Sequence, residues 1–248
     1  MKRIKDPVHG YVPIRDDFVK HIVDRKFFQR LRQVRQLTAT HLVYPSGNHT
    51  RFEHSIGVYH LAEKALESLE SNGTFDEVSA DDVDEIKDTV SVAALLHDVG
   101  HPPLSHIGEQ LLDRDKIVDR LERHDFASEI RDIAAFGQDP LERHGRHELL
   151  SCVIILEEFG EGLRAMDIPP NEVCAYVLGV SIIGERDDVG QRKVAADLIS
   201  SGFDVDRLDY IARDDLMTGA EVANVDTDRV VRSYSTAGGG RWCSPIRP

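Results

Sequence analysis

The stretch "VSVAALLHDVGHPPLSH", residues 90–106, decides how we interpret the whole chain. The apolar run that opens it is typical of a buried helix. The run ends in His97-Asp98, and two further histidines, His101 and His106, follow within nine residues. A buried aspartate is costly unless it is paired or bound to a metal. The stretch therefore predicts a core helix that delivers polar side chains to a site.

Helical periodicity extends outward from this stretch over most of the chain. Apolar residues recur at helical spacing from Asp17 to Leu37, which predicts one helix there. Further helices are expected at about 53–70, from Ser79 to Gly100, at 146–160, 170–183 and 188–200, and after Asp204. Short β-segments are expected near the N-terminus, at "YVPI". The predicted fold class is all-α.

Two segments differ from the rest in composition. Residues 107–146 are charged and helix-like, and we interpret them as an insert or a lid. Residues 232–248 are basic and rich in Gly, Ser and Pro, which is typical of a disordered tail. We therefore expect one domain over 1–231, followed by the tail.

The formal net charge of −14 argues against a general nucleic-acid-binding surface. Arginine supplies 22 of the 30 basic residues, which leads to the hypothesis of a halophilic protein; an ordinary acidic protein is the alternative. The chain has neither an apolar run long enough to span a membrane nor a secretory signal, so a cytoplasmic protein is expected. The three cysteines have no zinc spacing and are expected to be reduced, mostly buried thiols.

Three separate segments place ionisable side chains where they can face inward. His54 lies on an apolar helical stripe with Val58, Leu61, Ala65 and Leu69. His97 and Asp98 end the core helix, and Asp206 lies in "DVDRLDYIARDD", residues 204–215. Histidine nitrogens and carboxylate oxygens suit a divalent metal. The alternatives are a hydrogen-bonded Asp–His pair in the core and a solvated acidic helix start.

These segments together resemble a known family. "RFEHSIGV", "LLHDVGHPPLSH", "HELLS" and "DVDRLDYIARDD" are similar to the signature segments of the HD-domain phosphohydrolases. The segments "DPVHGY", "FQRLRQVRQL" and "VYPSGNHTRFEHS" are similar to the deoxynucleoside-triphosphate triphosphohydrolase branch. The resemblance covers most of residues 1–229.

The resemblance implies a helical HD fold with one divalent metal ion in its core, which could be Mn, Fe, Zn, Ni or Mg. The implied metal ligands are His54, His97, Asp98 and Asp206. The implied catalytic residues are His101, His106, His147 and Glu109; Glu109 stands where a relative has Asp. The implied substrate-binding residues are Arg51, Arg207, Tyr210, Asp214, Gln36 and Leu37.

The implied reaction is attack of water at the α-phosphorus of a deoxynucleoside triphosphate, which releases the deoxynucleoside and triphosphate. The family also implies a homo-oligomer and C-terminal parts that bind nucleotide activators, and this chain is expected to lack those parts. Two alternatives stay open. One is a phosphodiesterase or nucleotidase that acts on another phosphate ester, and the other is an inactive domain that senses nucleotides or binds a partner.

Overall fold

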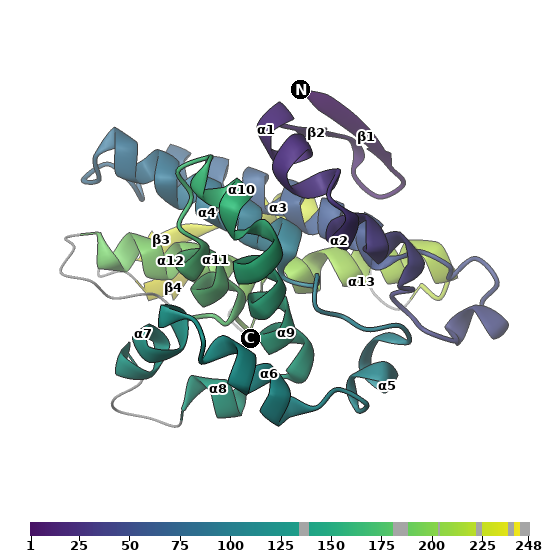
Figure 1. Ribbon diagram of the computed structural model, residues 1–248. Helices are drawn as coiled ribbons and strands as arrows, with labels where there is room; N and C mark the ends of the chain where they lie inside the picture. Colours follow the sequence, from purple (N-terminus) through teal and green to yellow (C-terminus); the bar gives the residue numbers. More distant parts are fainter. Residues whose placement is uncertain (134–138, 181–187, 203, 222–224, 238–240, 244–248) are drawn as a thin grey trace.

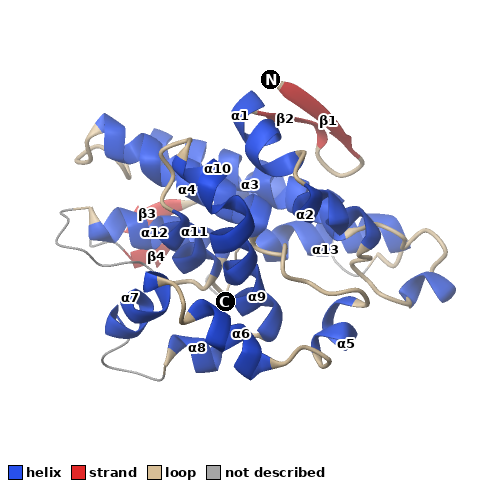
Figure 2. Ribbon diagram, in the orientation of Figure 1, coloured by secondary structure: helices blue, strands red, loops and turns tan. Residues whose placement is uncertain are grey.

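The computed structural model describes residues 1–133, 139–180, 188–202, 204–221, 225–237 and 241–243. Helices dominate it, and a short two-stranded hairpin lies at the N-terminus (Figure 2). The prediction of an all-α fold with short N-terminal β-segments is thus confirmed. Among the described residues, no helix combines the length and the apolar character that crossing a membrane requires.

Two long helices form the centre of the molecule (Figure 1). They are α3 (Arg51–Ser71) and α4 (Ala80–Leu96), and α4 begins where the Ser79 hydroxyl accepts a hydrogen bond from the Asp82 backbone N–H. Around them pack α11 (Pro170–Val177), α12 (Val189–Ile199), α13 (Val205–Thr218) and α14 (Thr227–Arg232). Every residue from Thr89 to His101 is buried. The apolar run therefore ends inside the protein, as its composition predicts.

The N-terminal hairpin consists of β1 (Lys2–Asp6) and β2 (Gly10–Ile14), antiparallel with Asp6 opposite Gly10. The single helix expected from Asp17 to Leu37 is wrong. The segment divides into α1 (Asp16–Phe18), a π-helical turn (Val19–Val23), α2 (Lys26–Gln29) and a 3₁₀ turn (Arg30–Gln33), and a further 3₁₀ turn follows it at Thr40–Leu42. Arg25 and Val34 adopt extended backbone angles, which interrupt the helix while the apolar side chains still pack inward.

A second layer lies on the opposite side of the central helices from the hairpin (Figure 1). It contains α5 (Ser105–Glu109), α6 (Arg114–Leu121), α7 (Asp125–Ile133) and α8 (Pro140–Arg143). It is followed by α9 (Arg146–Ile154), a π-helical turn (Ile155–Phe159) and α10 (Gly160–Arg164). Residues 107–146 are charged outside, but Leu121, Phe126 and Ile130 are fully buried. The described part of this segment therefore packs on the body as an amphipathic layer.

The chain remains folded past the boundary expected at residue 231. The side chain of Tyr234 is buried, and its carbonyl accepts a hydrogen bond from the Asn72 side-chain amide at 2.8 Å. Strands β3 (Ser235–Ala237) and β4 (Arg241–Cys243) pair antiparallel. Composition alone misses this because the contacts are made with α3, far away in sequence. The rest of the expected tail, 238–240 and 244–248, lies outside the described residues.

Candidate active site

The first turn of α3 points His54 into the core. The Glu53 carboxylate accepts hydrogen bonds from the backbone N–H of Thr50, at 2.7 Å, and from its hydroxyl. Such a capping box fixes the start of a helix. His54 is therefore placed on the buried stripe that helical spacing predicts, together with Val58, Leu61, Ala65 and Leu69, all of them buried.

The end of α4 brings His97 and Asp98 to the same place. Gly100 then allows α9 to approach closely, since a Cβ there would lie 2.2 Å from the His147 carbonyl oxygen. Ser151 on α9 joins the two segments: its hydroxyl donates to the His97 carbonyl at 2.7 Å and accepts from the Gly100 N–H at 2.8 Å. This contact brings α9, with His147, to the chain that follows α4.

Four side chains form what we call the His–Asp cluster: His54, His97, Asp98 and Asp206. His54 Nε2 lies 2.8 Å from Asp206 Oδ1 and 3.7 Å from Asp98 Oδ2. His97 Nε2 lies 3.6 Å from Asp98 Oδ2 and 3.7 Å from Asp206 Oδ1. Asp206 is 36% exposed, so the cluster opens to solvent on the α13 side.

The donor atoms of this cluster fit a divalent cation. The Nδ1 atom of His97 donates to the Ala94 carbonyl at 2.9 Å, which leaves a lone pair on Nε2. The Nε2 atoms of both histidines are buried without a partner in hydrogen-bond geometry among the described residues. Two ring nitrogens and two carboxylates thus converge on one point, where a positive charge, either a proton or a metal ion, is stabilised. Imidazole and carboxylate ligands match Mn, Fe, Zn or Ni.

The electrostatics of the cluster point the same way. Burial opposes a charged His54, but the close carboxylates of Asp206 and Asp209 raise its pKa to about 10. Burial likewise opposes an ionised Asp98, yet the charges of Arg51, His97 and His101 hold the pKa of Asp98 well below its usual range. The site therefore attracts positive charge, and a metal ion would compete with a proton for it.

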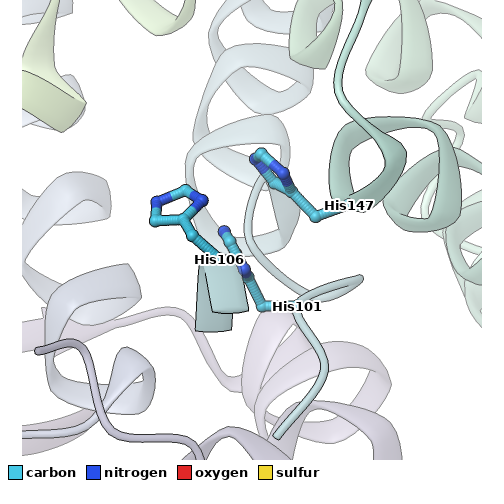
Figure 3. A group of neighbouring side chains, drawn as sticks. All are labelled: His101, His106 and His147. Carbon is cyan, nitrogen blue, oxygen red and sulfur yellow. The ribbon is translucent and has the colours of Figure 1, made fainter. Parts of the chain in front are cut away.

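A second group, which we call the histidine cluster, consists of His101, His106 and His147 (Figure 3). The rings of His101 and His147 stack with centroids 4.0 Å apart, and His106 stands edge-on to both. His101 Nε2 lies 3.3 Å from Asp98 Oδ1, so Asp98 touches both clusters. His106 is 68% exposed and forms the outer edge of the group.

Glu109 lies behind the histidine cluster. Its Oε1 lies 3.0 Å from His147 Nδ1, and its Oε2 lies 3.4 Å from His106 Nδ1. Burial raises the pKa of Glu109, but contacts with His147 and His106 outweigh that and lower it to about 2. Burial lowers the pKa of His101 to about 4 despite Asp98. At neutral pH, a charged Glu109 therefore faces a stack that contains a neutral His101.

The basic side chains of the expected substrate site lie in very different places. Arg51 is buried between the clusters, where it contacts Asp98 and donates to the Ser105 hydroxyl at 2.9 Å. Arg207 is exposed, and its guanidinium donates to the Gly202 carbonyl at 2.6 Å. Neighbouring positions on a helix diverge by about 100°. Arg207 is thus not directed into the His–Asp cluster with Asp206.

Two of the other expected substrate residues, Gln36 and Asp214, contact His49. The backbone N–H of Gln36 donates to the His49 backbone carbonyl at 3.1 Å. The ring of His49 contacts the Asp214 carboxylate at 2.8 Å. The Oε1 atom of Gln36 is buried and has no hydrogen-bond partner in the part of the chain that the structure describes. Leu37 follows Gln36 and is half-buried, as is Tyr210, one turn after Asp206. Through His49, Gln36 is thus brought towards Asp214 on α13, whereas the guanidinium of Arg207 is bonded to Gly202.

Three residues in these contacts were missed by the sequence interpretation: His9, His49 and Asp209. Asp209 could have been found, because it lies three positions after Asp206 and therefore on a neighbouring part of the same helix face. His9 and His49 lie within the quoted segments "DPVHGY" and "VYPSGNHTRFEHS", but their partners on α13 follow only from the tertiary fold.

These features define a helical protein with a buried His/Asp group suited to a divalent metal, beside a cluster of histidines. The HD domain model matches residues 51–214, and the chain belongs to that family. HD domains bind divalent metals, in accord with the donor set of the His–Asp cluster.

Three proteins illustrate how this chain relates to others. It is 29% identical to YwfO of Bacillus subtilis, over 93% of this chain and 43% of that protein. It is 30% identical to the deoxynucleoside triphosphate triphosphohydrolase SAMHD1 of Danio rerio, over 94% of this chain and 36% of that protein. The crystal structure of a phosphohydrolase from Bacteroides thetaiotaomicron superposes with a TM-score of 0.68 at 26% identity, over 98% of this chain and 48% of the other. The chain thus spans less than half the length of these proteins.

Proposed function

We propose that the protein is a metal-dependent phosphohydrolase that converts deoxynucleoside triphosphates to deoxynucleosides and triphosphate. The observation that carries this proposal is the position of Asp98. One of its oxygens faces the ring nitrogens of His54 and His97, and the other faces His101. A phosphate ester at this point would contact a metal on one side and proton-transferring histidines on the other.

In this proposal one divalent ion is held by His54, His97, Asp98 and Asp206. Such an ion supplies Lewis acidity, which polarises a phosphoryl oxygen and lowers the pKa of water. Arg51 keeps Asp98 ionised and contributes positive charge beside the phosphates. Because Asp98, Asp206 and Asp209 bring negative charge to the site, this arginine matters for attracting an anionic substrate.

The histidine cluster would handle protons and phosphate oxygens. His106 is exposed and faces Glu109, so it can donate to a phosphate or to a leaving oxygen. Glu109 orients His147 through the 3.0 Å contact at Nδ1, which leaves Nε2 of His147 for the substrate. Tyr210, Asp214, Gln36 and Leu37 would bind the sugar and base, and Arg207 would reach the phosphates only after leaving Gly202.

The similarity to SAMHD1 of Danio rerio supports the choice of substrate, and the phosphohydrolase from Bacteroides thetaiotaomicron supports the reaction class. We also propose that the protein is cytoplasmic and that it is a homo-oligomer. Light scattering on the purified chain would test the oligomeric state. Helix α5 carries His106 of the histidine cluster, and we propose that α5 and the described part of residues 107–146 form the rim of the substrate site.

Product analysis tests the proposal. The purified chain is assayed with each of the four deoxynucleoside triphosphates in Mn, Fe, Zn, Ni or Mg, beside Asp206→Asn. Triphosphate release that falls at least 100-fold in Asp206→Asn supports it, with Asp119→Asn, an exposed change on α6, as the matched control. Release of orthophosphate or pyrophosphate indicates a different phosphohydrolase. No hydrolysis by a metal-loaded chain indicates a nucleotide-sensing domain.

A further inference from the structure

Both edges of the His54 ring face carboxylates of α13. Its Nε2 lies 2.8 Å from Asp206 Oδ1, and its Nδ1 lies 2.8 Å from Asp209 Oδ2. The two aspartates are three positions apart on one helix and therefore lie on neighbouring parts of its surface. Asp206 faces the opening of the His–Asp cluster, whereas the Asp209 side chain is fully buried behind the ring. The two carboxylates consequently have different environments.

The Asp209 carboxylate is saturated with donors. Arg213 binds it with two N–H groups, Nε to Oδ2 at 2.8 Å and Nη2 to Oδ1 at 2.9 Å. His9 contacts Oδ1 through Nε2 at 2.6 Å. A carboxylate that accepts two N–H groups from a guanidinium offers only acceptor atoms, so His54 Nδ1 donates to Asp209 Oδ2, and Nε2 is the atom available to a metal.

The N-terminal hairpin supplies two members of this network. His9 lies in the turn between β1 and β2, and Asp6 at the end of β1 accepts a hydrogen bond from Arg213 Nη1 at 2.8 Å. The other Asp6 oxygen accepts the backbone N–H of His9 at 2.9 Å. Gly57 on α3 gives the network its space, because a Cβ there would lie 1.9 Å from Asp209 Oδ1. The hairpin, α3 and α13 thus meet behind His54.

We propose that Asp209 is a positioning residue that fixes the ring plane and the protonated nitrogen of His54, and that the hairpin strengthens metal binding by holding Asp209 through His9 and Arg213. The inference rests on the proposed metal site. It assigns the hairpin a role at the site although none of its residues belongs to the His–Asp cluster. Mutation of a carboxylate that holds a ligating histidine commonly lowers metal affinity 10–100-fold.

The test measures Mn²⁺ affinity by calorimetry on the full chain, well below the melting temperature. Asp209→Asn keeps the shape but removes the charge, and we expect its Mn²⁺ affinity to fall 10–100-fold. His9→Gln leaves Arg213 in place, so a 3–10-fold loss is expected. The matched control is Asp214→Asn, since Asp214 on the same helix contacts another buried histidine, His49, outside the His–Asp cluster. That variant is expected to keep its Mn²⁺ affinity within 2-fold.

A second readout reports on the ring itself. In Zn²⁺-loaded protein, ¹H–¹⁵N spectra of His54 are expected to show the proton on Nδ1 in the wild type and a loss of that single state in Asp209→Asn. A purely structural role would lower the melting temperature of Asp209→Asn and Asp214→Asn alike and leave the affinity unchanged, which overturns the proposal.

The remaining outcomes separate the positioning role of Asp209 from the proposed function. If Asp209→Asn fails to fold, unchanged affinity in His9→Gln overturns the proposal, and weakened affinity supports it. A wild-type chain that binds Mn²⁺ but hydrolyses no deoxynucleoside triphosphate refutes the proposed function alone, while the affinities still test the positioning role. A wild-type chain that binds no divalent metal overturns both.

Discussion

The His–Asp cluster and the histidine cluster meet at Asp98, yet they are held in different ways. The first is built on the long helices α3 and α13 and on the end of α4, and its residues from α3 and α4 are buried. The second depends on the chain after α4, on the five-residue helix α5 and on the start of α9. Its outermost residue, His106, is exposed. The His–Asp cluster is therefore fixed by core packing, whereas the histidine cluster depends on a surface segment and on contacts of α9 with the chain that follows α4.

The largest expected effect separates the chemistry of the two clusters. His147→Ala should lower turnover 10²–10⁴-fold, as for loss of an acid–base group, while Mn²⁺ affinity stays within 3-fold. His97→Ala should abolish both, because it removes a proposed metal ligand. Calorimetry and product assays on the same samples measure this contrast. Loss of Mn²⁺ binding in His147→Ala would show that the two clusters form one metal site.

The next effect tests the contact that joins α9 to the end of α4. Gly100→Ala should destabilise the protein by about 3 kcal/mol, because the new Cβ meets backbone atoms that cannot rotate away. For a chain of this size the melting temperature should fall by about 6–12 °C, measured by calorimetry. Gly190→Ala on α12 is the control, since a Cβ at that position would meet no atom of the described residues within 4 Å. Equal melting temperatures for the two variants would refute the close approach.

A smaller effect of opposite sign is expected in the segment that leads to His106. Leu104 has a φ of +65° and is 60% exposed, so it bears the cost of a left-handed backbone with little burial in return. Leu104→Gly should be neutral or should raise the free energy of unfolding by about 1 kcal/mol in urea titrations. Turnover should fall at the same time, because a freer backbone holds His106 less firmly. Lower stability together with unchanged turnover would contradict this description of the segment.

The smallest effect concerns pH and the back of the His–Asp cluster. Burial, helped by His9 and Lys64, lowers the pKa of His60 to about 4, below the value of about 6.5 in an unfolded chain. The unfolded state therefore binds the proton more readily, so stability from a neutral His60 is present above pH 6.5 and is lost as the pH falls towards 4. His60→Gln should flatten the melting-temperature curve in this window, whereas His124→Gln on the opposite layer should not. An unchanged slope in His60→Gln would contradict the shift.

Periodicity predicted those parts of the fold in which local pattern and packing agree. The stripe that begins at His54 and the apolar run before His97 both follow from spacing, and the structure confirms them as buried faces of α3 and α4. Spacing failed between Asp17 and Leu37, because extended backbone at Arg25 and Val34 breaks the helix without moving the apolar residues out of the core.

The site was predicted mainly by the resemblance of its sequence motifs to a known family, and less by local spacing. The resemblance named His54, His97, Asp98 and Asp206 as metal ligands, a role that spacing alone left open, and the structure brings these four side chains together. The histidine stack with His147 depends on Gly100 and Ser151, which are 51 residues apart, and no local pattern encodes that contact. The network behind His54 was missed for the same reason. The catalytic and substrate roles stay predictions until the variants are measured.

The hydrogen bond between Gly100 and Ser151 also matters for any attempt to transfer the site into a related protein. Because α9 touches backbone at Gly100 and carries His147, residues 97–109 and α9 form one transferable unit. A chimera with a relative that exchanges only the signature around His97 would join two surfaces not shaped for each other. If both segments are exchanged together, the hydrogen bond from Gly100 to Ser151 and the stack of His101 on His147 are both retained.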